Sequence, residues 1–152
     1  MVGIDWLMRA AHVLAGAAWV GGSIMYLVVV IPALRLAGPA PKLSAAIATQ
    51  FKRLTNLCIA VLLLSGGYLV FDRLTQTTLG WPYLVTLALK IAAALAMFAL
   101  AYYMGQSNIR KLAKRSTRFS QAAPKLMVAL GVLVFLLGAL LNLFFELAVA
   151  PH

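Results

Sequence analysis

The sequence holds few charged residues, very few acids and almost no cysteine. Of its 152 residues, 11% are charged, three are acidic and one, Cys58, is a cysteine. Soluble domains average about a quarter charged and about 45–50% apolar residues, whereas 64% of this chain is hydrophobic. Too few polar residues remain to cover a water-soluble surface, which excludes a soluble enzyme and a disordered chain. A single cysteine excludes an intrachain disulfide scaffold, and three acids are too few for a carboxylate-bridged metal site.

Long apolar segments take up most of the chain. Crossing a bilayer requires about 20 predominantly apolar residues, and four segments qualify: 4–36, 44–71, 81–104 and 123–149. Pro32 is expected to bend the first helix near its end, and Ser44 is placed to cap the second. We therefore predict an all-α integral membrane bundle of four transmembrane helices, forming a single domain of residues 1–152 in the cell (cytoplasmic or inner) membrane.

The cations are distributed unevenly between the two sides of this predicted bundle. Ten of the thirteen Lys and Arg residues lie in the first and third connections or at the adjoining helix ends. The opposite side holds two cations and all three acids. Under the positive-inside rule, the basic loop 105–122 faces the cytoplasm and both termini face outside. We expect that loop to contact anionic lipid, and we expect no nucleic-acid partner.

Small residues recur along the predicted helices, where they allow neighbouring backbones to approach closely. We expect helix packing at six glycines: Gly16, Gly21, Gly22, Gly66, Gly67 and Gly138. The alternative is that these positions leave space for a flat ligand such as a porphyrin.

Polar side chains inside membrane spans are costly and often functional. His12 lies about 12 Å from the outer end of the first span at a rise of about 1.5 Å per residue, on one helix face with Met8 and Trp19. One interpretation is a histidine hydrogen-bonded to a neighbouring helix. The other is a metal or haem ligand: imidazole with the Met8 thioether suits copper(I), and imidazole alone suits haem iron.

Lys90 lies at a similar depth in the third span and has three interpretations. It can form an ion pair with Glu146, extend its flexible stem toward the interface, or receive an anionic ligand group or balance a redox centre. Asn142 shares a helix stripe with Gly138 and Glu146, which predicts that it faces the bundle interior. Ser65, beside Gly66 in the second span, is a further supporting position.

Several of these segments resemble the copper-resistance D (CopD) family. The resemblance spans about residues 6–115 and is carried, in order, by His12–Gly22, Pro32–Leu34, Phe51–Arg53, Ser65–Gly67, Tyr83 and Lys90. The related membrane protoporphyrinogen oxidases of the HemJ type are similar in length and number of spans, and they share the histidine of the first helix and the lysine of the third.

The resemblance implies a four-helix membrane protein with a metal or haem site in the outer half, built around His12 and Lys90. Copper transport or homeostasis is the first function that it implies. Haem-b redox chemistry, as protoporphyrinogen oxidation or electron transfer, is the second. A third hypothesis is a non-catalytic accessory subunit of a larger membrane complex, and a homo-oligomer is also possible.

The charge asymmetry yields a testable topology. Reporter fusions at His152 and within the loop 105–121 should report opposite sides of the membrane, because ten cations lie on the loop side and two on the other. A carboxy terminus on the cytoplasmic side would contradict both the topology and the assignment of His12 and Lys90 to the outer half.

Overall fold

The computed structural model describes residues 2–76, 80–106 and 118–149, and within them every regular element is helical. The elements are α1 (Val2–Met25), η1 (Tyr26–Val30), α2 (Ile31–Leu36), α3 (Pro41–Gln76), α4 (Trp81–Gln106) and α6 (Arg118–Val149). Four helical stretches are long and apolar enough to cross a membrane: Gly3–Leu36, Pro41–Thr75, Trp81–Tyr103 and Ala122–Leu147. The predicted all-α, multi-pass fold is confirmed.

Several helices are longer than predicted. α3 begins at Pro41, so Ser44 is not its cap and instead lies inside the first turn, where its Oγ donates to the Ala40 carbonyl at 3.0 Å. Proline suits the first helical position because its missing N–H has no acceptor there. The predicted loop 105–122 is helical at both ends, since α4 runs to Gln106 and α6 starts at Arg118. Residues 107–117, which hold most of that loop's cations, and His152 lie outside the described residues.

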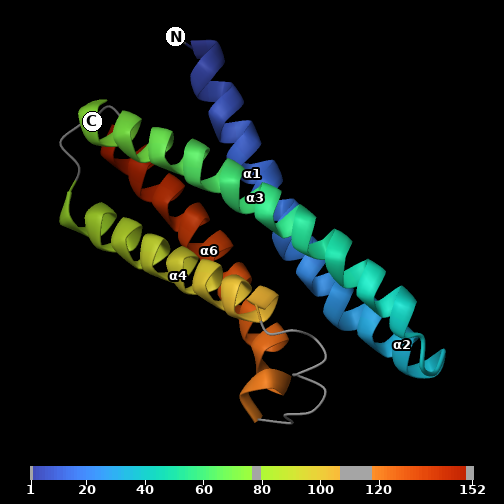
Figure 1. Cartoon of the computed structure of the whole chain (residues 1–152). Coiled ribbons are helices and arrows are strands. Elements are labelled where there is room, and N and C mark those ends of the chain that lie inside the picture. Colours follow the sequence, from blue (N-terminus) through green and yellow to red (C-terminus); the bar gives the residue numbers. More distant parts are fainter. Residues whose placement is uncertain (1, 77–79, 107–117, 150–152) are drawn as a thin grey trace. The chain divides into compact units, whose positions relative to one another are not determined.

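The chain divides into two compact units, residues 1–72 and 73–152, and each is considered by itself. The first is an antiparallel helical hairpin. His12 of α1 contacts Ser65 of α3, and Tyr26 of η1 stacks on Phe51 at a centroid distance of 5.1 Å, so numbers rise along one helix as they fall along the other. Gly38, with φ of +78°, lies in the turn between α2 and α3 (Figure 1), where a residue without Cβ adopts this conformation easily.

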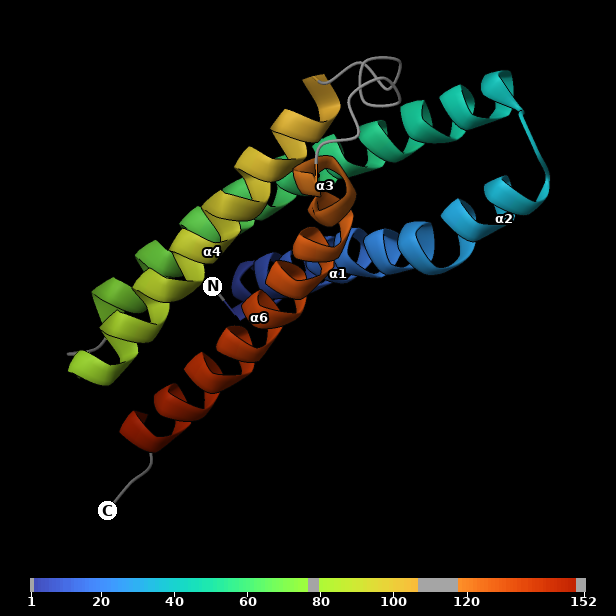
Figure 2. The ribbon, with the colours of Figure 1, turned by 90° about the horizontal axis from the view of Figure 1, so that it is seen from below.

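The helix is distorted near Pro32, as expected, and the distortion is a π-helical turn that precedes the proline. The Ile31 N–H donates to the Tyr26 carbonyl five residues earlier, which defines the π-helical turn η1. Pro32 has no N–H, and its ring collides with the carbonyl four residues earlier, so the helix cannot pass through it unchanged. Figure 2 shows α2 continuing beyond α1 to the turn that leads into α3.

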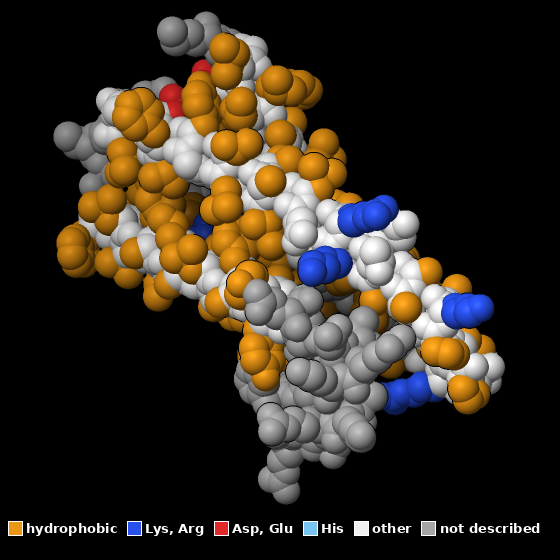
Figure 3. Space-filling view, in the orientation of Figure 1, with side chains coloured by type: hydrophobic (Ala, Val, Ile, Leu, Met, Phe, Trp, Pro, Cys, Tyr) orange, Lys and Arg blue, Asp and Glu red, His pale blue; other side chains and the backbone are white. Residues whose placement is uncertain are grey.

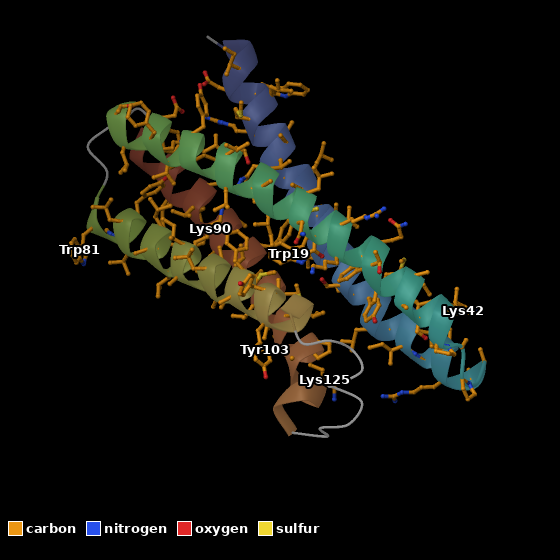
Figure 4. The ribbon with its side chains drawn as sticks, viewed as in Figure 1. Trp19, Lys42, Trp81, Lys90, Tyr103 and Lys125 are labelled. Carbon is orange, nitrogen blue, oxygen red and sulfur yellow. The ribbon has the colours of Figure 1, made fainter. Side chains whose placement is uncertain are left out.

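In the second unit α4 packs against α6. Buried residues recur at helical spacing on both, and they are Tyr83, Thr86, Met97 and Leu100 on α4 and Ala123, Met127 and Leu141 on α6. Figure 4 shows Trp81 at one end of α4, Tyr103 at the other and Lys90 between them. Trp81 and Tyr103 are both exposed, as expected for aromatic residues near the two membrane interfaces.

Candidate functional site in the first hairpin

His12 is held by a short chain of hydrogen bonds across the first hairpin. Its Nδ1 lies 2.9 Å from the Oγ of Ser65. The Ser65 hydroxyl in turn donates to the Val61 carbonyl one turn earlier in α3, at 2.6 Å. A serine hydroxyl carries one hydrogen, so with that hydrogen directed at Val61 its oxygen accepts from His12. Neutral His12 is therefore protonated on Nδ1, and Nε2 carries the lone pair.

The ring of His12 is also fixed by close packing. A Cβ added at Gly66 would lie 3.1 Å from Cε1 of His12 and 3.6 Å from its Nδ1, so only glycine leaves the ring where it is. Ser65 is 2% exposed, whereas His12 is half-buried. Hydrogen bond and packing together set both the tautomer and the orientation of the imidazole, the usual arrangement for a metal-ligating histidine.

A second polar contact lies two turns away toward the chain terminus. The Tyr68 hydroxyl donates to Oδ1 of Asp5 at 2.6 Å. Asp5 and His12 are seven residues apart on α1, or about 10 Å along the axis, and they share one face. The sequence predicted no partner for either side chain, so this contact was missed. Asp5 is seven residues from His12, whereas Tyr68 is three residues from Ser65, so the sequence spacings do not match and the contact follows only from how the two helices pack.

The other residues predicted to support His12 differ in what they contact. Trp19 is buried, at 2% exposed, and its backbone carbonyl accepts a hydrogen bond from Ser23 Oγ at 2.8 Å within α1 (Figure 4). Met8 lies one turn before His12 and is half-buried. Cys58, in α3, is buried.

The donor set for a metal is small. Within the described parts of the chain, no three His, Cys, Asp or Glu side chains come together to hold a metal ion. His12 is the one histidine among the described residues. A site there has one imidazole and, at most, the Met8 thioether from the same helix. Such a set suits a cofactor that brings most of its own ligands.

Lys90 occupies the packed face of α4 in the second unit. A Cβ at Gly138 of α6 would lie 3.1 Å from Lys90 Nζ and 3.7 Å from Cε, so the missing side chain of Gly138 makes room for the ammonium group (Figure 4). Lys90 is half-buried, and among the described residues it forms no hydrogen bond or ion pair. A desolvated cation needs an anionic or water partner, so the predicted role in receiving an anionic group stays a prediction.

The two residues of α6 that were predicted to support the site do not contact Lys90. Asn142 is exposed, and its Nδ2 donates to Oε1 of the equally exposed Glu146 at 2.6 Å, one turn along the same helix. The side of α6 that contacts α4 passes through Gly138 and Leu141, so Asn142 lies off that side, and the prediction that it faces the bundle interior stays a prediction. No Lys90–Glu146 ion pair forms among the described residues.

Phe145 makes a cation–π contact with Arg73, whose guanidinium lies 3.3 Å from the Phe145 ring centroid. The sequence did not predict this contact.

The six predicted packing glycines behave differently. Gly66 and Gly138 make the approaches described above, and a Cβ at Gly22 would touch Phe51 at 3.4 Å and Leu54 at 3.8 Å. At Gly21 and Gly67 a Cβ would meet no described atom within 4 Å, so these two contribute no close contact in the part of the chain that the structure describes. The packing role of Gly16, half-buried one turn after His12, stays a prediction.

Comparisons of the chain with models of protein families, with curated proteins and with solved structures found no match. The site is therefore interpreted from its own chemistry.

Adjacent glycines provide a matched test of the His12 geometry. Gly67→Ala should raise stability by up to about 1 kcal/mol, because alanine favours a helix and the space is open. Gly66→Ala should lose this gain and also weaken the His12–Ser65 hydrogen bond, worth about 1 kcal/mol, by displacing the ring. Thermal unfolding in detergent and imidazole ¹⁵N NMR measure both effects. An unshifted His12 signal in Gly66→Ala would contradict the packing described.

A double-mutant cycle can test whether Lys90 and Glu146 interact. Lys90→Met and Glu146→Gln should change thermal stability independently, with a coupling energy below about 0.5 kcal/mol. A buried ion pair would behave differently: each single change would cost about 3–5 kcal/mol, and the double change would restore stability. Compensation of that kind would show that the two groups are paired.

Proposed function

We propose that the protein is a haem-b-binding redox protein of the cytoplasmic membrane, with His12 Nε2 as the protein ligand to the iron. The single observation that supports this most strongly is the His12–Ser65–Val61 hydrogen-bond chain, which leaves the lone pair on Nε2. A bound haem supplies one-electron redox chemistry, and the protein sets its position and surroundings. Electron transfer and oxidation of a porphyrin-like substrate are the two activities that fit.

The number of donors favours haem over copper. A porphyrin provides four nitrogen ligands, so one well-oriented imidazole is a sufficient anchor for its iron. Copper needs two or three protein donors, and within the described residues no group of three or more His, Cys, Asp or Glu side chains could hold it. The residues present therefore fit haem better than a bare metal ion.

The position of His12 also suits a redox centre. The Asp5–Tyr68 contact lies about two turns nearer the chain terminus, so His12 is set back from that end of the hairpin. Ala15 and Trp19, which follow His12 on the same helix, are both buried. Low polarity around a haem strengthens its interactions with charged groups and tunes its potential.

One observation favours copper handling as a second candidate. Met8 precedes His12 by one turn, and both are half-buried, so a thioether and an imidazole lie on one helix face. Such a pair is a soft donor set of the kind that copper(I) prefers. Replacing Met8 separates the two candidates, because haem bound through His12 does not require the thioether.

The experiment is an absorbance spectrum and a metal analysis of the full chain, purified in mild detergent. We expect a Soret band that His12→Ala abolishes and that Met8→Leu leaves unchanged. Ser65→Ala should weaken haem binding by roughly 10–100-fold, because loss of an outer-shell partner frees the ring. Circular dichroism of each variant verifies that the helices remain.

Three outcomes would contradict haem binding at His12. Stoichiometric copper that is lost in both His12→Ala and Met8→Leu would favour the second candidate. A protein that takes up neither haem nor copper when both are supplied, or a Soret band that survives His12→Ala, would exclude His12 as a ligand.

A further inference from the structure

The helices of the first hairpin are longer than a bilayer requires. α3 has 36 residues, or about 54 Å at 1.5 Å per residue, against a hydrocarbon thickness of about 30 Å. Between Arg53 and Asp72 the helix has 18 uncharged residues, about 27 Å, which matches that thickness. The first three turns of α3, from Pro41 to Arg53, therefore extend past the hydrocarbon on the side of Arg53.

The partner of this extension is the end of the first helical stretch. Tyr26 stacks on Phe51, and Gly22 approaches Phe51 and Leu54. The residues after Tyr26, in η1 and α2, therefore accompany the start of α3 up to the turn at Gly38. We call the segment Ile24–Arg53 the basic arm.

The basic arm exposes two kinds of side chain. The segment formed by the end of α1, η1 and α2 exposes large aliphatic side chains. Their exposed fractions are 58% at Met25, 62% at Val28, 57% at Val29 and 90% at Leu36. The cations of the arm are all exposed and are Arg35, Lys42, Lys52 and Arg53. Figure 3 shows the blue Lys and Arg side chains gathered over α2 and the first half of α3.

No acid offsets these cations. The three acids of the sequence are Asp5, Asp72 and Glu146, so the basic arm contains none. Its surface therefore combines unbalanced positive charge with exposed aliphatic groups. That combination is typical of helices that lie at the surface of an anionic membrane, with aliphatic side chains entering the acyl boundary and cations meeting phosphates.

We infer that the basic arm binds the headgroups of anionic phospholipids in the leaflet next to Arg53. An acidic protein would also attract its cations. Lipid is favoured because the aliphatic side chains need an apolar environment as well, and because both helices of the arm continue directly into membrane spans. The lipid supplies both environments in one place.

The test measures which lipids gather at the arm of the full chain in nanodiscs. Thr49, exposed on α3, is changed to Cys in a Cys58→Ser background and labelled with a fluorescent donor. Trace phosphatidylglycerol or phosphatidylcholine carries the same acyl-chain acceptor in one fixed host mixture. We expect greater energy transfer to phosphatidylglycerol, with the preference reduced in high salt. The matched control donor is at Leu7→Cys, exposed on α1 at the opposite end of the hairpin, and should show almost no preference.

The decisive variant carries Lys42→Gln, Lys52→Gln and Arg53→Gln, three changes at exposed positions that leave the packing intact. Each cation near an anionic surface contributes about 1 kcal/mol, so relative affinity for phosphatidylglycerol should fall by roughly 100-fold and the preference at position 49 should disappear. Equal transfer to both lipids in the unaltered arm, or a preference that survives the triple change, overturns the inference. Retention of a soluble polyglutamate peptide without any lipid preference would instead assign the arm to an acidic protein.

Discussion

The hydrogen-bond chain from His12 through Ser65 to Val61 is the interaction on which the first hairpin depends. In an apolar environment an unmet polar group is expensive, so a histidine inside a span must be given a partner. Ser65 provides one without using a second ionisable group, because its hydroxyl passes its hydrogen to a backbone carbonyl and accepts from the imidazole. This arrangement requires α1 and α3 to hold one register and one separation, and Gly66 permits that separation. The same bonds that stabilise the hairpin therefore decide which histidine nitrogen carries the proton.

Lys90 shows the opposite solution to the same constraint. The missing side chain of Gly138 leaves space for its ammonium group, but no described residue accepts a hydrogen bond from it. A histidine can be satisfied as a neutral group, whereas a lysine that stays charged needs an anion or water and loses stability without one. The first hairpin thus supplies a hydrogen-bond partner for His12 Nδ1 from its own residues. The second unit places the Lys90 cation on an apolar helix face. Lys90 therefore depends on something that the described residues do not provide.

The sequence could predict the helical spans better than it could predict which residues meet. Hydropathy and length gave four spans, and an imidazole in an apolar run marked His12. The Asp5–Tyr68 pair escaped notice because the meeting of these two side chains depends on how α1 and α3 pack in the hairpin. Asn142 lies off the α4-facing side of α6 for a geometric reason: at 3.6 residues per turn, Leu141 rather than Asn142 continues the face that starts at Gly138. A π turn before Pro32 likewise adds a residue that hydropathy does not register.

The excess length of α3 fixes the depth of His12 without reference to the loop charges. Arg53 and Asp72 bound a run whose length matches the hydrocarbon thickness, so they mark its two edges on this helix. Ser65 is seven residues from Asp72 and twelve from Arg53, or about 10 Å and about 18 Å. Because His12 bonds to Ser65, it lies closer to Asp72 than to Arg53 along the hairpin, and we expect it in the half of the membrane nearer Asp72. The unequal position separates the two features of the hairpin: an oriented imidazole close to the acidic edge, and a basic arm that begins beyond the opposite one.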